Sequence, residues 1–279
     1  MDDINKLLER TFPILEYDPH SKPVIEAKNL YDKTRNPRGI TRCLLTYFQD
    51  IVEKFEHAEI LNQVFRLRTE GVRPRIYEKF IPFEKGDSKQ VSGGTPAGEY
   101  IYVVPVAGGA PYAARMLESM AAIGITKFMV CGGAGTLDDS VTRANVLVPI
   151  SAIRDEGTSY HYLPPAREVF IYREVLEKIR KTLNRLGEPF IEIKTWTTDG
   201  NFRETERKVA FRRSEGCSTV EMECAAFYAV AQHKKILCGQ LLYAGDIVKK
   251  EGWEYRNWHA KTDIREKLFN LAIECLMEL

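Results

Sequence analysis

A membrane-spanning helix needs about 18 to 20 consecutive apolar residues. The chain of 279 residues contains no hydrophobic run that approaches this length. Its first ten residues, MDDINKLLER, are acidic and polar, whereas a secretory signal begins basic and continues apolar. Forty basic residues against thirty-nine acidic ones leave a formal charge of +1, which gives no electrostatic reason to expect nucleic acid or an anionic membrane as partner. We therefore expect a cytoplasmic protein that has neither partner.

Metal-ligating and nucleotide-binding patterns are missing as well. The six cysteines are scattered, with no CxxC pair and no clustering with histidine, so neither a zinc site nor a disulfide framework is indicated. We expect no bound metal, no organic cofactor and reduced thiols in the core. The fingerprints GxGxxG and GxxxxGK are also absent, which argues against a dinucleotide-binding fold and a P-loop.

What the sequence does contain is an alternation of strand and helix patterns. Apolar runs typical of buried strands are followed by segments with apolar residues three and four apart, typical of amphipathic helices. Examples are the strand pattern at 100–106 and the helix patterns at 49–61, 112–124 and 173–187. This alternation predicts an α/β fold, arranged as three layers (α/β/α) with a central mixed sheet.

The first forty residues differ from the rest because proline recurs there too often for regular structure to persist. The prolines are Pro13, Pro19, Pro23 and Pro37. We expect residues 1–40 to begin with a helix and to continue as an irregular, atypical amino-terminal arm. No repeat or linker divides the chain, so we predict a single domain over residues 1–279.

Two glycine-rich stretches follow apolar strands, GGAP at 108–111 and GGAG at 132–135. Glycine permits positive φ and lets backbone N–H groups approach an anion or a sugar closely. A purely structural turn is the alternative for each stretch. The second stretch is the better candidate because it directly terminates a core strand, and Gly109, Gly132 and Gly133 are candidate substrate-binding residues.

The order of the motifs GGAP, CGGAGTL, RDEGTSYHY, TTDGNFRET, VEME and YAGD resembles the nucleoside phosphorylase superfamily of the purine nucleoside and uridine phosphorylase type. This superfamily includes nucleosidases, which use water in place of phosphate. The resemblance runs from about Tyr100 to the carboxy terminus. Its most specific part is VEMECAA, followed by Asp246 in YAGD.

The resemblance implies a role for each residue of the VEME motif. Glu223 matches the glutamate that binds the ribose hydroxyls, and Met222 matches the methionine that lies against the sugar. Glu221 matches the first glutamate of the motif, whose role varies among relatives. A carboxylate can accept both hydroxyls of a diol and stabilise the oxocarbenium character that develops when an N-glycosidic bond breaks. The alternative is a solvated pair that favours the start of a helix.

At the base, the resemblance implies that Asp246 protonates or hydrogen-bonds to the leaving base at N7, which favours purines. A helix cap or turn is the alternative for Asp246. Val220 is expected to line the pocket. Asn201 occupies the position at which relatives carry a stacking aromatic residue, so we assign base stacking to Phe202. Nearby, Arg203 and Glu204 either contact the base or pair on the surface.

The phosphate site is where this sequence departs from the family pattern. Val130 stands where hexameric phosphorylases carry an arginine, and Gly133 stands where they carry serine or threonine. Three arginines are possible substitutes, each with a structural role as the alternative: Arg42, Arg115 and Arg154. His161 is a further candidate for contact with the substrate. The aromatic segment with Trp253, Tyr255 and Trp258 is a candidate for a lid or a subunit interface.

Together these observations favour a pentosyltransferase, a nucleoside phosphorylase that forms a homo-oligomer. It would cleave a purine nucleoside with phosphate as co-substrate, giving free base and ribose 1-phosphate. Two alternatives stay open: a nucleosidase that uses water, and a non-catalytic nucleoside-binding or storage protein on the same fold.

Overall fold

The structure is a computed structural model that describes residues 12–69, 73–83, 97–138, 141, 146–249, 252–255 and 262–279. Its α-helices are α2 (Gln49–His57), α3 (Ala110–Ala122), α4 (Arg173–Arg185), α5 (Glu206–Ser214), α6 (Cys224–Lys234) and α7 (Thr262–Glu278). Its strands are β1 (Arg42–Thr46), β2 (Asn62–Arg66), β3 (Arg75–Pro82), β4 (Gly98–Pro105), β5 (Lys127–Thr136), β6 (Val146–Asp155), β7 (Glu168–Phe170), β8 (Phe190–Thr198), β9 (Cys217–Glu221), β10 (Leu237–Lys249) and β11 (Gly252–Glu254).

All of these strands belong to one sheet, whose order is β11-β10-β6-β8-β9-β5-β1-β4-β3-β2, with β7 paired to β6. The pairs β1–β4, β1–β5, β5–β10, β6–β8 and β8–β9 are parallel, whereas β2–β3, β3–β4, β5–β9 and β6–β10 are antiparallel. Because β10 pairs with both β5 and β6, five strands close on themselves in the middle of the sheet. The predicted mixed sheet and α/β class are confirmed.

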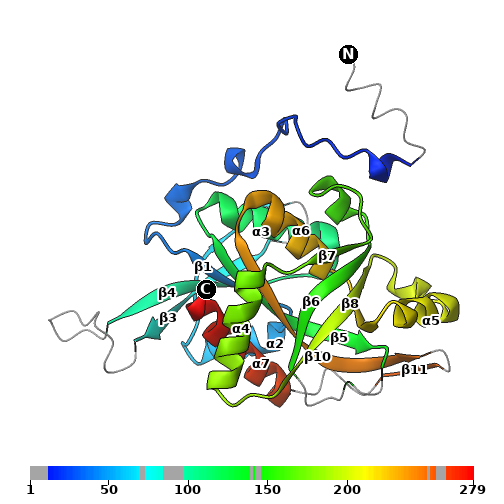
Figure 1. Cartoon of the computed structure of the whole chain (residues 1–279). Coiled ribbons are helices and arrows are strands. Elements are labelled where there is room, and N and C mark those ends of the chain that lie inside the picture. Colours follow the sequence, from blue (N-terminus) through cyan, green and yellow to red (C-terminus); the bar gives the residue numbers. More distant parts are fainter. Residues whose placement is uncertain are drawn as a thin grey trace.

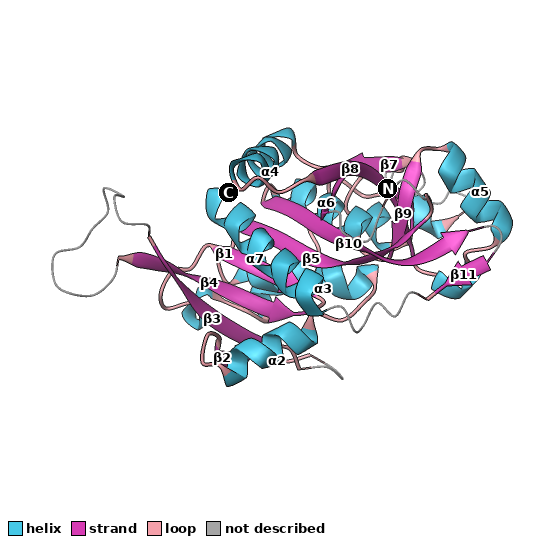
Figure 2. Ribbon diagram, turned by 90° about the horizontal axis from the view of Figure 1, so that it is seen from below, coloured by secondary structure: helices cyan, strands magenta, loops and turns pink. Residues whose placement is uncertain are grey.

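Helices cover both faces of the sheet. In Figure 1, α3 and α6 lie together above it and α2, α4 and α7 lie below it. Figure 2 views the same molecule from below, with α7 lying across β1, β5 and β10 and α4 next to α7. The strands are apolar throughout their middle because both faces are covered, as in β1, where Cys43, Leu44 and Leu45 are fully buried. None of the described helices is long and apolar enough to cross a membrane.

The amino-terminal arm is irregular over residues 12–40, as predicted. It contains three short 3-10 helices, η1 (Pro13–Leu15), η2 (Ala27–Asn29) and η3 (Lys33–Arg35), and no longer element. Figure 1 shows it crossing the molecule above α3 and α6. The helix predicted at the start of the arm lies largely outside the described residues. The assignment of one domain to residues 1–279 stays a prediction.

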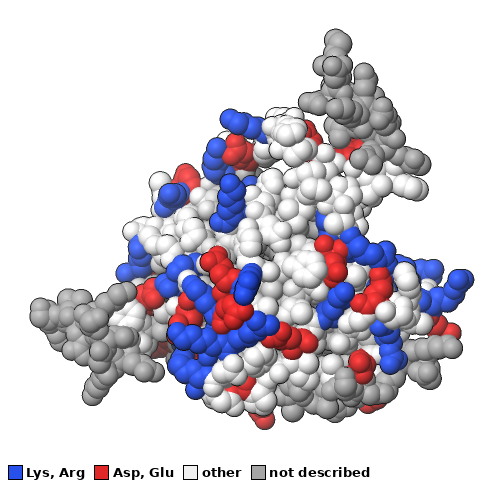
Figure 3. All heavy atoms as spheres, in the orientation of Figure 1, with Lys and Arg blue, Asp and Glu red and all other residues white. Residues whose placement is uncertain are grey.

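Acidic and basic side chains alternate on the surface, which agrees with the balanced composition. Figure 3 shows blue and red atoms interspersed over the face it presents. On α4, Arg180 pairs with Glu177 at 2.9 Å and with Glu192 at 2.6 Å, so neighbouring charges neutralise each other locally. The six cysteines are buried and unpaired, as the sequence predicts for core thiols.

The prediction of a turn at GGAG was wrong, because Gly132 and Gly133 lie inside β5, which continues to Thr136. These glycines are needed for close packing and not for a reversal of the chain. A Cβ on Gly132 would lie 2.9 Å from Cδ2 of Tyr47, and one on Gly133 would lie 3.1 Å from Cε1 of Tyr243. Asp246, expected after a strand, likewise lies within β10.

Candidate active site

The VEME motif forms the junction between β9 and α6, as its sequence suggested. Glu221 is the last residue of β9, and Glu223 is the residue immediately before α6. Both carboxylates are buried, with only 7% and 8% of their surface exposed. The small residues Ala225 and Ala226 are fully buried, so α6 lies close enough to the sheet to enclose its own first turn. Charge in such a place requires dedicated partners.

Glu221 is fully occupied by hydrogen bonds from the protein. One oxygen, Oε2, accepts the backbone N–H groups of Glu223 at 2.8 Å and Cys224 at 2.7 Å. The other, Oε1, accepts the hydroxyl of Thr197 at 2.5 Å. These bonds satisfy N–H groups that have no partner within the helix, so Glu221 caps α6. Glu221 therefore stabilises the start of the helix, as the alternative expected, but it is buried and not solvated.

Glu223 has a different environment, because it connects two helices and faces a cavity. Its Oε1 accepts the backbone N–H of Gly109 at 2.5 Å. Gly109 precedes α3 with φ at 106°, a conformation that favours glycine. The amino-terminal ends of α3 and α6 thus meet at this carboxylate. The Tyr47 hydroxyl and the backbone of Met222 also lie close enough to this carboxylate to lower its pKa.

Burial raises the pKa of both carboxyl groups. For Glu221 the charge of Glu223 is the second cause, while hydrogen bonds from the Thr197 hydroxyl and the two backbone N–H groups act in the opposite direction and lower the pKa. For Glu223 the hydrogen bond from Gly109 acts in the opposite direction to burial and lowers the pKa. Two like charges this close resist ionising together, so the pair tends to retain a proton.

A cavity of about 460 Å³ opens beside Glu223. Its wall comes from β5, β9, β10, α7 and the loops that follow β1, β4, β8 and β9: Tyr47, Phe48, Val106, Gly108, Gly132, Gly133, Ala134, Gly135, Asn201, Glu204, Val220, Glu221, Met222, Glu223, Gln240, Leu242, Tyr243, Gly245, Asp246, Val248 and Arg265. The predicted site residues from 132 to 133 and from 220 to 246 are therefore brought together around one space, whereas Gly109 lies beside it through its bond to Glu223.

Strand β5 divides the wall into two sides. Near Gly135, the ideal Cβ position lies 3.2 Å from Oδ1 of Asp246 and 3.1 Å from Val220. Three residues earlier, Gly132 packs against Tyr47. A strand rises about 3.3 Å per residue, so these two positions are roughly 10 Å apart. We call the surroundings of Gly135 the base side and those of Gly132 and Gly133 the nucleophile side.

The base side carries two carboxyl groups. Asp246 accepts the indole N–H of Trp253 at Oδ2, at 2.5 Å. Glu204 lines the same cavity, and burial first, then the charge of Asp246, raises the pKa of Glu204 to about 7.

The nucleophile side is aromatic, with a single charged group among the described residues of its wall. Arg265 of α7 pairs with Asp50 at 2.6 Å and lies over the ring of Phe48. Gln240 is 1% exposed, and neither polar atom of its amide has a hydrogen-bond partner among the residues that the structure describes. It lies opposite Val130 in the register of β10 with β5. A buried amide without a partner is poised for a ligand.

Phe202, the predicted stacking residue, does not reach the cavity. It is 94% exposed in η5 (Asn201–Arg203), while its neighbours Asn201 and Glu204 line the wall. A short 3-10 helix turns side chains by about 120° per residue, so adjacent residues cannot share one direction. Arg203 is also exposed.

The three arginines proposed for phosphate lie away from the cavity wall. Arg42 donates to the carbonyls of Leu276 and Met277 and pairs with Glu99. Arg154 is buried and donates to Ser159 and to the carbonyls of the loop after η4 (Thr158–His161). Both are structural.

Arg115 and His161 line a second hollow between α3 and η4, of about 430 Å³. Among the aromatic candidates, Trp253 contacts Asp246 and Tyr255 packs edge-on against Trp253. Trp258 lies outside the described residues. Within the described part of the chain, no group of three or more His, Cys, Asp or Glu side chains could hold a metal ion.

Tyr47, Gln240 and Arg265 were not anticipated from the sequence. Gln240 carried a signal, since it is the one polar side chain in the run ILCGQLLYAG of a buried strand. Arg265 shares a helical face with Leu268 and Ala272, at positions i, i+3 and i+7, which also pointed it inward. Tyr47 carried none, because an aromatic residue after an apolar strand is ordinary core sequence.

Comparison with known proteins agrees with this geometry. Residues 69–274 match the sequence model described as the phosphorylase superfamily. A guanosine phosphorylase from Halorubrum lacusprofundi is 23% identical over 133 residues, which are 48% of this chain and 55% of that protein.

Two solved structures share the fold. An AMP nucleosidase from Bacteroides thetaiotaomicron superposes with a TM-score of 0.65 and 21% identity, covering 90% of this chain and 96% of that one. A uridine phosphorylase from Vibrio fischeri superposes with a TM-score of 0.67 and 17% identity, covering 94% of this chain and all of that one.

Proposed function

The chain belongs to the phosphorylase superfamily, and on this premise we propose that it cleaves the N-glycosidic bond of a nucleoside. The observation that carries the proposal is Glu223, a buried carboxylate that is fixed by the N–H of Gly109 and lines a 460 Å³ cavity. Bond cleavage gives the sugar oxocarbenium character, which a fixed carboxylate stabilises while it accepts the ribose hydroxyls. Met222 lines the same wall and would lie against the sugar.

We propose a purine as the base, because a nitrogen such as N7 needs an acid beside it when the base leaves. Asp246 and Glu204 supply carboxyl groups at the base side. Val220 packs near Asp246 and gives the base an apolar surface.

Water is the nucleophile that the wall favours. The described lining carries four carboxyl groups, Glu204, Glu221, Glu223 and Asp246, against one arginine that is already paired with Asp50. A phosphate dianion would meet repulsion, in a poorly solvated site, from those of these carboxyl groups that are ionised. The space beside Gly132 and Gly133 is also occupied by tyrosine rings. Water needs only hydrogen-bond partners, and Gln240 offers them.

Phosphorolysis, the first expectation from the sequence, is the second candidate. Arg265 favours it, since its guanidinium lines the cavity and could exchange Asp50 for phosphate. The guanosine phosphorylase relative also supports it. In that case the protein would be a pentosyltransferase with phosphate as its co-substrate and no further cofactor. A non-catalytic binding protein is the remaining possibility, and it would bind nucleosides without releasing base.

We further propose that the protein forms a homo-oligomer. The arm exposes apolar side chains that water solvates poorly, with Val24 fully exposed, Ile25 73% exposed and Leu30 60% exposed. A second copy of the chain would cover them.

The experiment is a chromatographic assay of purified protein with a panel of purine and pyrimidine nucleosides, with and without phosphate. Base release at the same rate in both conditions supports the nucleosidase. Release only with phosphate, together with ribose 1-phosphate, supports the second candidate. Absence of release from every nucleoside in both conditions would refute the enzymatic proposal, and binding measured on the same panel would then support the third possibility.

A further inference from the structure

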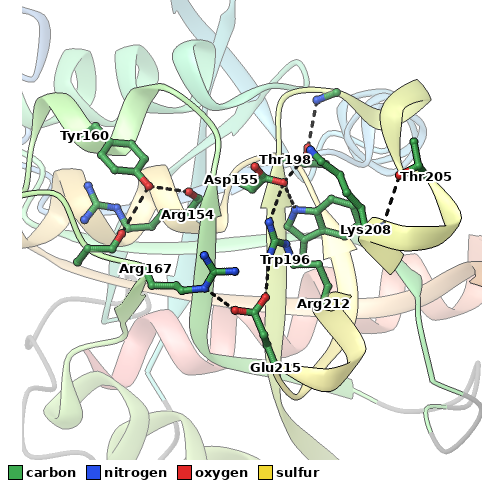
Figure 4. Close-up of polar contacts among 12 residues, drawn as sticks. Arg154, Asp155, Tyr160, Arg167, Trp196, Thr198, Thr205, Lys208, Arg212 and Glu215 are labelled. Atoms are coloured by element: carbon green, nitrogen blue, oxygen red, sulfur yellow. Dashed lines mark hydrogen bonds and ion pairs between the residues drawn. The ribbon is translucent and has the colours of Figure 1, made fainter. Parts of the chain in front are cut away.

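Glu204 is held at the cavity by a helix that is itself anchored to the sheet. The segment Asn201–Glu204 leads into α5, where the Thr205 hydroxyl caps the helix by accepting the N–H of Lys208. Figure 4 shows Trp196, Lys208 and Arg212 converging on Asp155.

Three contacts make this anchor. Oδ2 of Asp155 accepts the indole N–H of Trp196 at 2.9 Å and pairs with Lys208 and Arg212, each at 3.2 Å. Lys208 and Arg212 are therefore engaged with Asp155, which lies on β6, and the start of α5 is fixed relative to the sheet. This fixes where Glu204 enters the cavity.

Asp246 is committed as a hydrogen-bond acceptor. The indole N–H of Trp253 can only donate, so Oδ2 is its acceptor and the carboxyl group is held in place. Oδ1 extends toward Gly135, where a Cβ would lie 3.2 Å from it. The bond to Trp253 therefore fixes Asp246 with Oδ1 facing the base side.

The carboxyl group of Glu204 has no such hydrogen bond among the described residues. Within the described part of the chain, its carboxyl group makes no hydrogen bond or ion pair, although it is partly buried in the cavity wall. Burial, and to a smaller extent the charge of Asp246, raises the pKa of Glu204 to about 7. A carboxyl group in this state can keep its proton near neutral pH and release it to a ligand.

We propose that Glu204 is the acid that protonates the leaving purine, while Asp246 is the fixed acceptor that orients it. This assignment rests on the proposed cleavage of an N-glycosidic bond. Asp246, for which the sequence had suggested the acid role, becomes the partner that accepts a hydrogen from the base.

The step balances as follows. The C1′–N9 bond breaks and its electron pair goes to the purine, while the carboxyl proton of Glu204 moves to N7. The base leaves as a neutral molecule. Water adds to C1′ and loses a proton to solvent, and solvent returns a proton to the Glu204 carboxylate for the next turnover.

One donor beside one acceptor also selects the base. A 6-aminopurine presents an acceptor at N7 and a donor at its amino group, which complement Glu204 and Asp246. A 6-oxopurine presents two acceptors, so its oxygen would face the Asp246 carboxylate without a hydrogen bond. Sites that leave a buried polar group unpaired discriminate strongly. The pair therefore selects nucleosides of 6-aminopurines.

The test compares leaving groups. Glu204→Gln keeps the shape of the side chain but has no proton to give, so the kcat for adenosine is expected to fall by about 10² to 10³. With 4-nitrophenyl β-ribofuranoside, whose phenolate leaves without a proton, the same variant is expected to stay within about threefold of the wild type, as an acid role predicts. Glu206→Gln, an exposed carboxyl two residues away, is the matched control and should change neither rate.

Equal losses on both substrates, or no loss on adenosine, would overturn the acid assignment while leaving the proposed function intact. If the wild type cleaves no riboside at all, the proposed function itself fails. Selectivity gives a second readout: Asp246→Asn should shift the ratio of adenosine to inosine turnover toward inosine by about tenfold or more, because an amide can donate to O6. An unchanged ratio would overturn the role of Asp246 as the acceptor.

Discussion

On the sugar side of the cavity a buried carboxylate, Glu223, is held by the N–H of Gly109, whereas on the nucleophile side tyrosine rings lie against Gly132 and Gly133. Around Glu223, a backbone N–H group and the starts of two helices stabilise negative charge. Around Gly132 and Gly133, apolar ring surface replaces the positive charge that a phosphate needs. Under the proposed function, this contrast means that the fold keeps a carboxylate suited to a sugar while the group that attacks the sugar differs.

The largest expected effect is on the sugar side. Glu223→Ala removes the carboxylate that would stabilise the developing cation, so kcat/KM for the best nucleoside is expected to fall by about 10³ or more. Steady-state assays of base release measure it, with the exposed Glu174→Ala as control. A variant that keeps activity within about threefold of the wild type would remove Glu223 from the site, given the effect sizes typical of such groups.

Replacing Glu221 and replacing Glu223 should change the free energy of unfolding by different amounts. Glu221→Ala leaves the Thr197 hydroxyl and two backbone N–H groups without their acceptor, so the free energy of unfolding should fall by about 2 to 4 kcal/mol. Glu223→Ala frees only the N–H of Gly109 and should cost less. Urea denaturation compares them, and a larger loss in Glu223→Ala would contradict the division of roles.

Stability should also depend on pH through this pair. The folded protein raises the pKa of Glu221 to about 8 and that of Glu223 to about 7, from the 4.5 expected of an exposed glutamate. The folded state then binds more protons than the unfolded state between pH 4.5 and 8, so the free energy of unfolding falls as pH rises through this window.

The free energy of unfolding is expected to fall by several kcal/mol between pH 5 and 8. Urea denaturation at each pH measures it, and Glu221→Gln should flatten the profile because the amide does not titrate. A profile that rises over this range, or one that Glu221→Gln leaves unchanged, would show that the pair is ionised throughout.

A substitution of Gln240 tests whether the nucleophile side of the cavity binds a ligand. Gln240→Leu fills a similar volume and removes two buried polar atoms that have no partner in the protein, so stability should stay equal or rise by about 1 kcal/mol. Activity should nevertheless fall by about tenfold, the scale of one lost hydrogen bond to the ligand. The opposite pattern, a destabilised protein with full activity, would make Gln240 a structural residue.

The smallest effect is expected at Phe202. Because this side chain is 94% exposed and outside the cavity wall, Phe202→Ser should change kcat/KM by less than about threefold, as surface substitutions usually do. A large rise in KM confined to this variant would restore base stacking to Phe202 and would place the base nearer to η5.

The sequence predicted what is local and missed what is assembled from distant segments. VEMECAA joins a strand, a cap and a buried helix within a few residues, so its spacing was sufficient to predict the junction of β9 and α6. GGAG was interpreted as a turn because glycine in a strand and glycine in a turn look alike until the rings that pack on them are known. Arg265 joins the cavity only because α7 packs across β5 and β10.

Phe202 and Glu204 show a similar limit at shorter range. Their order in the sequence was known, but which of them points inward depends on the 3-10 turn of η5 and on the anchoring of α5 through Asp155. An aromatic residue was the chemically reasonable choice for a base site. The residue that lines the cavity is instead the carboxyl-bearing Glu204, two positions later.

The most direct test of the central claim, that the cavity cleaves a nucleoside with water, is mass spectrometry of the sugar product after turnover in water enriched in oxygen-18 with phosphate present. The account predicts free ribose that carries the heavy isotope at C1′, together with free base, and no product from Glu223→Ala. Ribose 1-phosphate without the isotope would contradict it.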